Sequence, residues 1–288
     1  MPDGHAGLFS EAGNGSIIPV YMKKRKKLGI ALGSGGPKGL YHVGVLKTLI
    51  RNDIPIDLLA GSSVGSWVGA HYALYKDLNR LEELTNGRKI EKLLSMLEFS
   101  FGGGFLKGER LGYLLNDWLK GASFSELQIP FRAVATDLAT GAQVIFRSGK
   151  LMPALRASMA IPGIFEPVPY HKRLLTDGGI SNPVPDDIVR AMGADVVLAV
   201  DLNGISQEST QKAPRKDIAN IVESAIDILY YHLAITSTRD ADFTLRPSLQ
   251  KYSSWKDYFM TDIGNQTIAL GERDAKKIIP ALRRKLEL

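Results

Sequence analysis

Two short apolar runs of this chain each end in a glycine-containing turn that continues directly into a helical pattern. The first run covers residues 28–32, and its turn at residues 33–39 leads into a helical pattern over residues 40–51. The second run covers residues 56–60 and is followed by a turn at residues 61–65 and another helical pattern. Because parallel strands need helical crossovers of one hand, this repeated unit predicts an α/β fold with a mostly parallel central sheet flanked by helices.

The rest of the chain adds further elements of the same kind. Residues 78–120 are predicted to be helical with an interruption at residues 99–105. Strands are predicted at residues 131–135, 143–147, 174–176, 195–200 and 243–245, and amphipathic helices at about residues 218–236 and 265–286. Residues 23–288 are therefore expected to form one domain. Residues 1–22 carry neither a basic cluster followed by an apolar core nor a strong periodicity, so we expect a disordered N-terminal extension or a tag.

Composition excludes cysteine-based chemistry and argues against a membrane-spanning segment in this sequence. The chain has no cysteine, which excludes disulfides, thiolate metal sites and a cysteine nucleophile. No apolar run approaches the roughly 20 residues that cross a bilayer, so we expect a cytoplasmic protein whose membrane contact, if any, is peripheral.

The net charge of +6 includes a basic run at residues 23–27. This run could attract anionic lipid head groups or nucleic acid, but a solvated flank of the following strand is the favoured interpretation. Few aromatic residues accompany it, so no nucleic-acid partner is expected.

The second turn, Gly61-Ser62-Ser63-Val64-Gly65, fits the pattern G-x-S-x-G between a strand and a helix. A serine in this position is held in a strained backbone conformation that projects its hydroxyl, and the N-terminus of the following helix favours developing negative charge. Ser63 is therefore the candidate nucleophile. The alternative is a purely structural tight turn.

The first turn, at residues 33–39, offers backbone amides that no side chain shields. Such amides bind either a phosphate group or an oxyanion. The dinucleotide pattern G-x-G-x-x-G fails because Lys38 stands at its third glycine, and the P-loop ending is absent. We expect the amides of Gly35 and Gly36 to face Ser63 as an oxyanion hole, with a tight turn at a helix start as the alternative.

A nucleophilic serine needs a base, and none of the five histidines is well placed for that role: His5, His42, His71, His171 and His232. Among the carboxylates, Asp177 follows a short strand and precedes Gly178 and Gly179, whose missing side chains let another loop approach. A carboxylate with an ordinary pKa is a weak base for a serine hydroxyl, so Asp177 must be partly buried or act mainly as the acceptor of the hydroxyl proton during attack. An ordinary Asp-Gly turn is the alternative. Asp137 and Asp201 also end strands, but neither precedes a glycine pair.

Taken together, these motifs resemble the patatin-like phospholipase family, and in particular its small bacterial members. The resemblance runs from residue 28 to about residue 202 and includes the glycine loop, the serine turn, Arg156-Ala157-Ser158-Met159-Ala160-Ile161-Pro162 and Asp177-Gly178-Gly179. It implies a three-layer fold and a Ser-Asp dyad without histidine, with Ser63 as nucleophile and Asp177 as base. It also implies an oxyanion loop of Gly35, Gly36 and Lys38, from which Pro37 is a mild departure because it lacks an amide hydrogen.

The resemblance further implies a carboxylic ester hydrolase that cleaves phospholipids, lysophospholipids or neutral lipids through an acyl-enzyme, without metal or cofactor. Its partner would be a lipid ester, met at a membrane surface. An acyltransferase or thioesterase would use the same acyl-enzyme, and a catalytically silent membrane-binding module is a further alternative. The sequence leaves the lipid class and the oligomeric state open.

Overall fold

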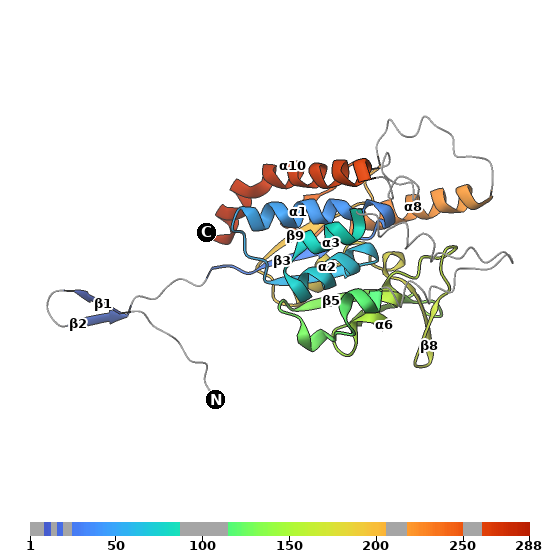
Figure 1. Cartoon of the computed structure of the whole chain (residues 1–288), viewed down its shortest axis with the longest axis horizontal. Helices are drawn as coiled ribbons and strands as arrows, with labels where there is room; N and C mark the ends of the chain where they lie inside the picture. The colour runs from blue at the N-terminus through green and yellow to red at the C-terminus, as the bar shows by residue number, and fades with distance from the viewer. Residues whose placement is uncertain (1–8, 13–15, 20–24, 87–114, 206–217, 250–260) are drawn as a thin grey trace.

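The computed structural model describes residues 9–12, 16–19, 25–86, 115–205, 218–249 and 261–288 (Figure 1). Its centre is an eight-stranded sheet of order β10-β9-β3-β4-β5-β8-β7, with β6 paired to β5. The strands are β3 (Leu28–Leu32), β4 (Leu58–Ser62), β5 (Phe131–Asp137), β6 (Gln143–Phe146), β7 (Val168–Tyr170), β8 (Arg173–Asp177), β9 (Val196–Val200) and β10 (Phe243–Leu245). The helices are α1 (Leu40–Arg51), α2 (Val64–Tyr75), α3 (Leu78–Asn86), α6 (Leu151–Ser158), α7 (Asp186–Ala191), α8 (Ile218–Ser237) and α10 (Thr261–Leu286).

The sheet is mixed. Strands β10, β9, β3, β4 and β5 pair in parallel, whereas β6 and β8 run antiparallel to β5, and β7 runs antiparallel to β8. Strands β3, β4 and β9 are buried along their whole length, as expected for parallel strands covered on both faces. The predicted α/β fold is confirmed, with the antiparallel edge as a refinement.

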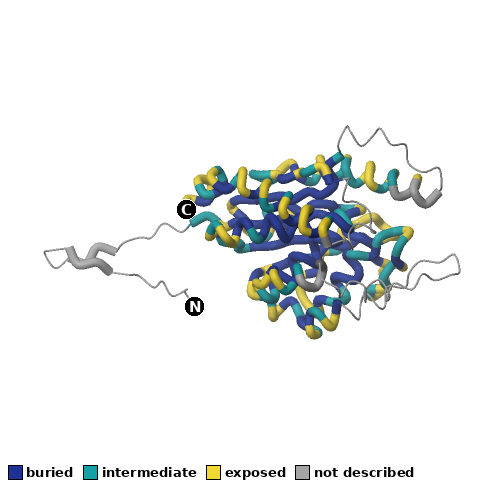
Figure 2. Tube along the Cα trace, turned by 45° about the horizontal axis from the view of Figure 1, so that its top comes forward, coloured by how far each residue is buried: buried dark blue, intermediate teal, exposed yellow. Residues whose placement is uncertain are grey.

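Helices cover both faces of the sheet. On one face, a large core joins β3, β4, β5 and β9 to α1, α2 and α10, which lie together on one side of the sheet in Figure 1. On the other face, a smaller core joins the sheet to α7 and to Ala234 of α8. The buried residues in Figure 2 therefore concentrate around the central strands.

Most predicted elements occur where the sequence places them, and the differences are local. Helices α6 and α7 and strand β7 are additional to those predicted. The interruption predicted at residues 99–105 lies outside the described part of the chain. Within the stretch expected to be disordered, β1 (Phe9–Ala12) and β2 (Ser16–Pro19) pair as antiparallel strands.

Part of the basic run has structural partners. The guanidinium of Arg25 donates two hydrogen bonds to the Asp57 carboxylate, at 2.7 and 2.6 Å. The ammonium of Lys26 lies 3.0 Å from a carboxylate oxygen of Glu287. These pairs hold the entry to β3 and favour a structural role for this half of the run. Residues 23 and 24 lie outside the described part of the chain.

Candidate active site

The turn between β4 and α2 has the geometry expected of a nucleophile-bearing elbow. Ser63 adopts φ 54° and ψ −126°, a conformation that non-glycine residues rarely occupy. A Cβ atom on Gly61 would lie 2.4 Å from the carbonyl oxygen of Gly65, and one on Gly65 would lie 2.1 Å from that of Leu32. Both glycines of the pattern are therefore required by close backbone approaches, while Ser63 carries the strain.

The hydroxyl of Ser63 donates a hydrogen bond of 2.6 Å to Oδ2 of Asp177. The other carboxylate oxygen, Oδ1, accepts a hydrogen bond of 2.7 Å from the amide of Gly179. Both residues are buried, with relative exposures of 3% for Ser63 and 1% for Asp177. A Cβ atom on Gly178 would lie 2.2 Å from the carbonyl oxygen of Val134, so this glycine allows the Asp177 loop to lie against the sheet.

Strand order explains why two residues so far apart in sequence meet. Strand β5 lies between β4 and β8. In the parallel pair, Ser62 is opposite Val134, and in the antiparallel pair, Asp177 is opposite Ala135. Because these partners on β5 are consecutive, Ser63 and Asp177 leave their strands at the same level on either side of β5.

Burial sets the protonation behaviour of the Asp177 carboxyl. Removal from water raises its pKa to about 7, and the hydrogen bonds from Ser63 and Gly179 oppose this rise. A carboxylate with a pKa near neutrality is a stronger base than an exposed aspartate and still ionises around pH 7. Burial, one of the two conditions that the sequence argument allows for a catalytic aspartate, is therefore present.

The segment at residues 156–162 supports both members of this pair. The hydroxyl of Ser158, the last residue of α6, accepts a hydrogen bond of 3.0 Å from the amide of Ser63. The carbonyl of Ala160 accepts one of 3.0 Å from the amide of Asp177. The sequence argument included this segment only through the family resemblance, because nothing local reveals that Ser158 contacts the elbow.

The glycine loop between β3 and α1 offers free backbone donors. Its first amide, that of Gly33, is bonded to the carbonyl of Val200 at 2.9 Å. Within the described part of the chain, no acceptor is found for the amides of Gly35 and Gly36. A Cβ atom on Gly35 would lie 2.6 Å from that of Leu202, so a side chain does not fit there. The role of these two amides as oxyanion donors stays a prediction.

His42 holds this loop from within α1. Its Nε2 donates a hydrogen bond of 2.8 Å to the carbonyl of Gly33, and burial lowers the pKa of the imidazole to about 4. The ring is therefore neutral near pH 7. Its contact with Gly33 indicates a structural role beneath the glycine loop.

Lys38 contributes differently from the two glycines. Its amide is already bonded to the carbonyl of Gly35 at 3.2 Å. Its ammonium is buried, which lowers the pKa of the side chain, while the charges of Asp227 and Asp201 oppose this shift. Any effect of Lys38 on an oxyanion would therefore come from its positive charge.

The other two carboxylates that end strands have structural partners. Oδ1 of Asp137 accepts a hydrogen bond of 3.0 Å from the amide of Ala139. Asp201 forms an ion pair with Arg246 and accepts a hydrogen bond of 2.8 Å from the amide of Asn203. Each stabilises the loop that follows its strand.

The remaining histidines lie away from the Ser-Asp pair. His71 is buried within α2, His171 is in the turn between β7 and β8, and His232 is exposed on α8. His5 is outside the described residues. No histidine in the described segments hydrogen-bonds to the elbow serine or to its carboxylate partner, in line with the expectation that none is well placed.

Comparison with known proteins identifies the family. The model of the family described as patatin-like phospholipase matches residues 30–189, which is more than half of the chain and includes both turns and Asp177. The chain belongs to the patatin-like phospholipase family.

Curated relatives agree with this assignment. Uncharacterized NTE family proteins of Mycobacterium bovis and Mycobacterium tuberculosis are 38% identical over 193 residues, which cover 66% of this chain and 52% of theirs. Human patatin-like phospholipase domain-containing protein 6 is 32% identical over 189 residues, or 64% of this chain and 14% of that protein. The matched region thus spans about half the length of the mycobacterial relatives and a small part of the human one.

A solved structure has the same fold. VipD from Legionella pneumophila superimposes with a TM-score of 0.62 over 95% of this chain and 70% of that chain, at 12% sequence identity. At this identity, the similarity establishes the patatin-like α/β architecture alone.

Proposed function

We propose that this patatin-like protein is a serine lipid acyl hydrolase that cleaves acyl esters of phospholipids and lysophospholipids. The observation that carries the proposal is the 2.6 Å hydrogen bond from Ser63 Oγ to Asp177 Oδ2, made at a strained elbow in a member of a phospholipase family. Ser63 would be the nucleophile and Asp177 its base, without a histidine.

In acylation, Asp177 would first accept the proton of Ser63 and then pass it to the leaving group. Ser63 Oγ attacks the ester carbonyl as its proton passes to Asp177, and the carbonyl oxygen becomes an oxyanion facing the amides of Gly35 and Gly36. Where such donors have been removed singly in other hydrolases, each is worth about 3–4 kcal/mol. When the tetrahedral intermediate collapses, the leaving alkoxide takes the proton from Asp177 and the acyl group remains on Ser63. Water then attacks the acyl-enzyme with Asp177 again as base. When the bond to Ser63 Oγ breaks, Asp177 returns that proton to Oγ and the fatty acid is released.

Substrate release from a defined panel tests this proposal. The purified protein is expected to release fatty acid from phospholipid and lysophospholipid micelles faster than from triglyceride or acyl-thioester, while Ser63→Ala gives the uncatalysed background. Incorporation of ¹⁸O from labelled water into the product would identify water as the acyl acceptor. Transfer to an added alcohol without ¹⁸O uptake would favour the acyltransferase alternative, and preferred thioester cleavage would favour the thioesterase. Binding of vesicles without turnover of any ester would favour a silent membrane-binding module.

We also propose that the protein reaches lipid through peripheral contact by α8. One side of this helix exposes large apolar side chains: Ile221 at 51%, Ile228 at 50%, Leu229 at 65% and Ile235 at 38%. Among the described helices, none has both the length and the apolar character to cross a bilayer. An apolar stripe of this kind is suited to lie in the interface of a membrane.

Vesicle co-sedimentation tests this contact. Ile228→Asp and Leu229→Asp are each expected to weaken binding to phosphatidylcholine vesicles by about tenfold or more, because each removes one buried aliphatic side chain from the lipid contact. Ile50→Asp is the matched control, since Ile50 is 41% exposed at the end of another helix, α1. Equal binding by all three variants would contradict the assignment of α8 as the contact.

A further inference from the structure

Helix α8 packs one side against the sheet. Ala234 on this side is fully buried in the smaller core. Tyr230 and Asp227 precede Ala234 by four and seven residues, so all three lie on the same side of the helix. Ile228 and Leu229 lie on the opposite, exposed side. The inner side of α8 is therefore defined by Tyr230 and Ala234, while Asp227, one turn earlier on the same side, is exposed.

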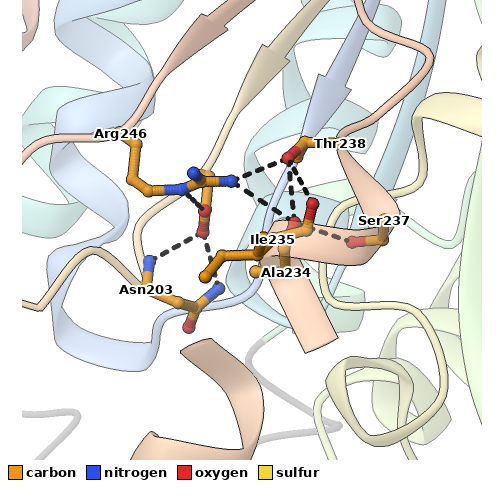
Figure 3. Close-up of polar contacts among 7 residues, drawn as sticks. Asn203, Ala234, Ile235, Ser237, Thr238 and Arg246 are labelled. Carbon is orange, nitrogen blue, oxygen red and sulfur yellow. Dashed lines mark hydrogen bonds and ion pairs between the residues drawn. The ribbon is translucent and has the colours of Figure 1, made fainter. Parts of the chain in front are cut away.

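The C-terminal end of α8 is fixed to the end of the sheet. The guanidinium of Arg246 donates to Thr238 Oγ1 at 2.7 Å and to the carbonyl of Ala234 at 3.4 Å, and its Nε pairs with Asp201 (Figure 3). Asp201 immediately follows β9, a central strand of the sheet. Tyr230 lies one turn before Ala234 on the inner side, so this network also limits where its ring can lie.

The hydroxyl of Tyr230 is buried but has no hydrogen-bond partner among the described residues. Buried hydroxyl groups are nearly always bonded, so an unpaired one suggests a partner that binds there. Burial and the negative charges of Asp177 and Asp227 raise the pKa of Tyr230, so the hydroxyl keeps its proton. Asp201, to which the end of α8 is tied through Arg246, follows β9 at the same edge of the sheet where Ser62 and Ser63 follow Gly61, because Val200 is level with Leu32 and Leu32 with Gly61.

We propose that Tyr230 is a further catalytic residue, whose hydroxyl donates a hydrogen bond to the leaving oxygen of the bound ester. This inference rests on the proposed hydrolase function. In acylation, the bond between the carbonyl carbon and the leaving oxygen breaks, and negative charge grows on that oxygen until Asp177 returns the proton. The Tyr230 hydroxyl retains its own proton and stabilises that growing charge. The contribution is therefore largest for a poor leaving group, such as the glycerol oxygen of a lipid.

Leaving-group dependence tests the proposal. For Tyr230→Phe, we expect hydrolysis of palmitoyl-lysophosphatidylcholine to fall by about 100-fold, the effect of removing one donor to a developing charge. Hydrolysis of p-nitrophenyl palmitate should fall by no more than about threefold, because p-nitrophenolate leaves without help. The melting temperature should be unchanged or higher, since the substitution removes an unpaired buried hydroxyl.

Tyr231→Phe is the matched control, because Tyr231 adjoins Tyr230 on α8 and its ring packs beside His232. Both activities of this variant should equal those of the wild-type protein. Equal losses for the two esters, no loss for either, or a lowered melting temperature in Tyr230→Phe would overturn the role of Tyr230. If the wild-type protein hydrolyses neither ester, it is the proposed function that fails.

Discussion

Replacing Ser63 by alanine is expected to abolish covalent labelling by a fluorophosphonate probe and to reduce lipid ester hydrolysis by at least about 1,000-fold. The substitution removes the only hydroxyl that is bonded to the Asp177 carboxylate among the described residues. Alanine should tolerate the elbow conformation about as poorly as serine does, so the fold should persist. Gel-based labelling, fatty-acid release and thermal melting, all measured on the same preparation, check these three expectations.

Ser62→Ala is the control for this experiment, because the sequence places two serines side by side in the turn. The Ser62 hydroxyl is buried and has no hydrogen-bond partner in the described segments. No hydrogen bond joins it to Asp177 in the described residues, so Ser62→Ala should label like the wild-type protein. Labelling that survives in Ser63→Ala but is lost in Ser62→Ala would show that Ser62, and not Ser63, is the nucleophile.

The fold could be predicted well wherever local pattern decides structure. Strands β3, β4 and β9 begin within two residues of the predicted apolar runs and are buried throughout, and each of the two glycine-containing turns lies between a strand and a helical segment. The antiparallel edge was not predicted. Strand β7, which forms a hairpin with β8, is only three residues long and gives no alternating pattern that would predict it.

The candidate site was predictable in its parts but not in its assembly. Gly61, Gly65 and Gly178 marked close backbone approaches that the structure contains. The meeting of Ser63 with Asp177 depends on β8 lying antiparallel beside β5, which no local pattern specifies. Hydrophobic periodicity also gives no information on contacts between residues far apart in sequence, such as the hydrogen bond between Ser158 and the amide of Ser63.

Replacing Asp177 by asparagine is expected to lower the rate of ester hydrolysis by about 100- to 10,000-fold, the range over which a general base contributes. Asparagine keeps the size of the side chain but cannot take the Ser63 proton. In the wild-type protein, kcat/KM should rise with pH through about 7 and then level off, because Asp177 must be ionised to act. Asp137→Asn is the control: Asp137 is also buried at a strand end, but its carboxylate bonds to Ala139. It should keep the wild-type rate and pH profile.

The same substitution should stabilise the fold in a pH-dependent way. The pKa of Asp177 is about 7 in the folded protein, against 3.8 for an aspartate exposed to water. Between these two values the folded state binds the proton more tightly than the unfolded chain, so the contribution of Asp177 to stability falls as pH rises across this window. Asparagine has no such titration. Asp177→Asn should therefore melt at a higher temperature than the wild-type protein at pH 8, and this advantage should shrink towards pH 4. A melting difference that does not change with pH would show that the pKa of Asp177 is not raised in the folded protein. The proposed role of Asp177 as a base would then lose its main support.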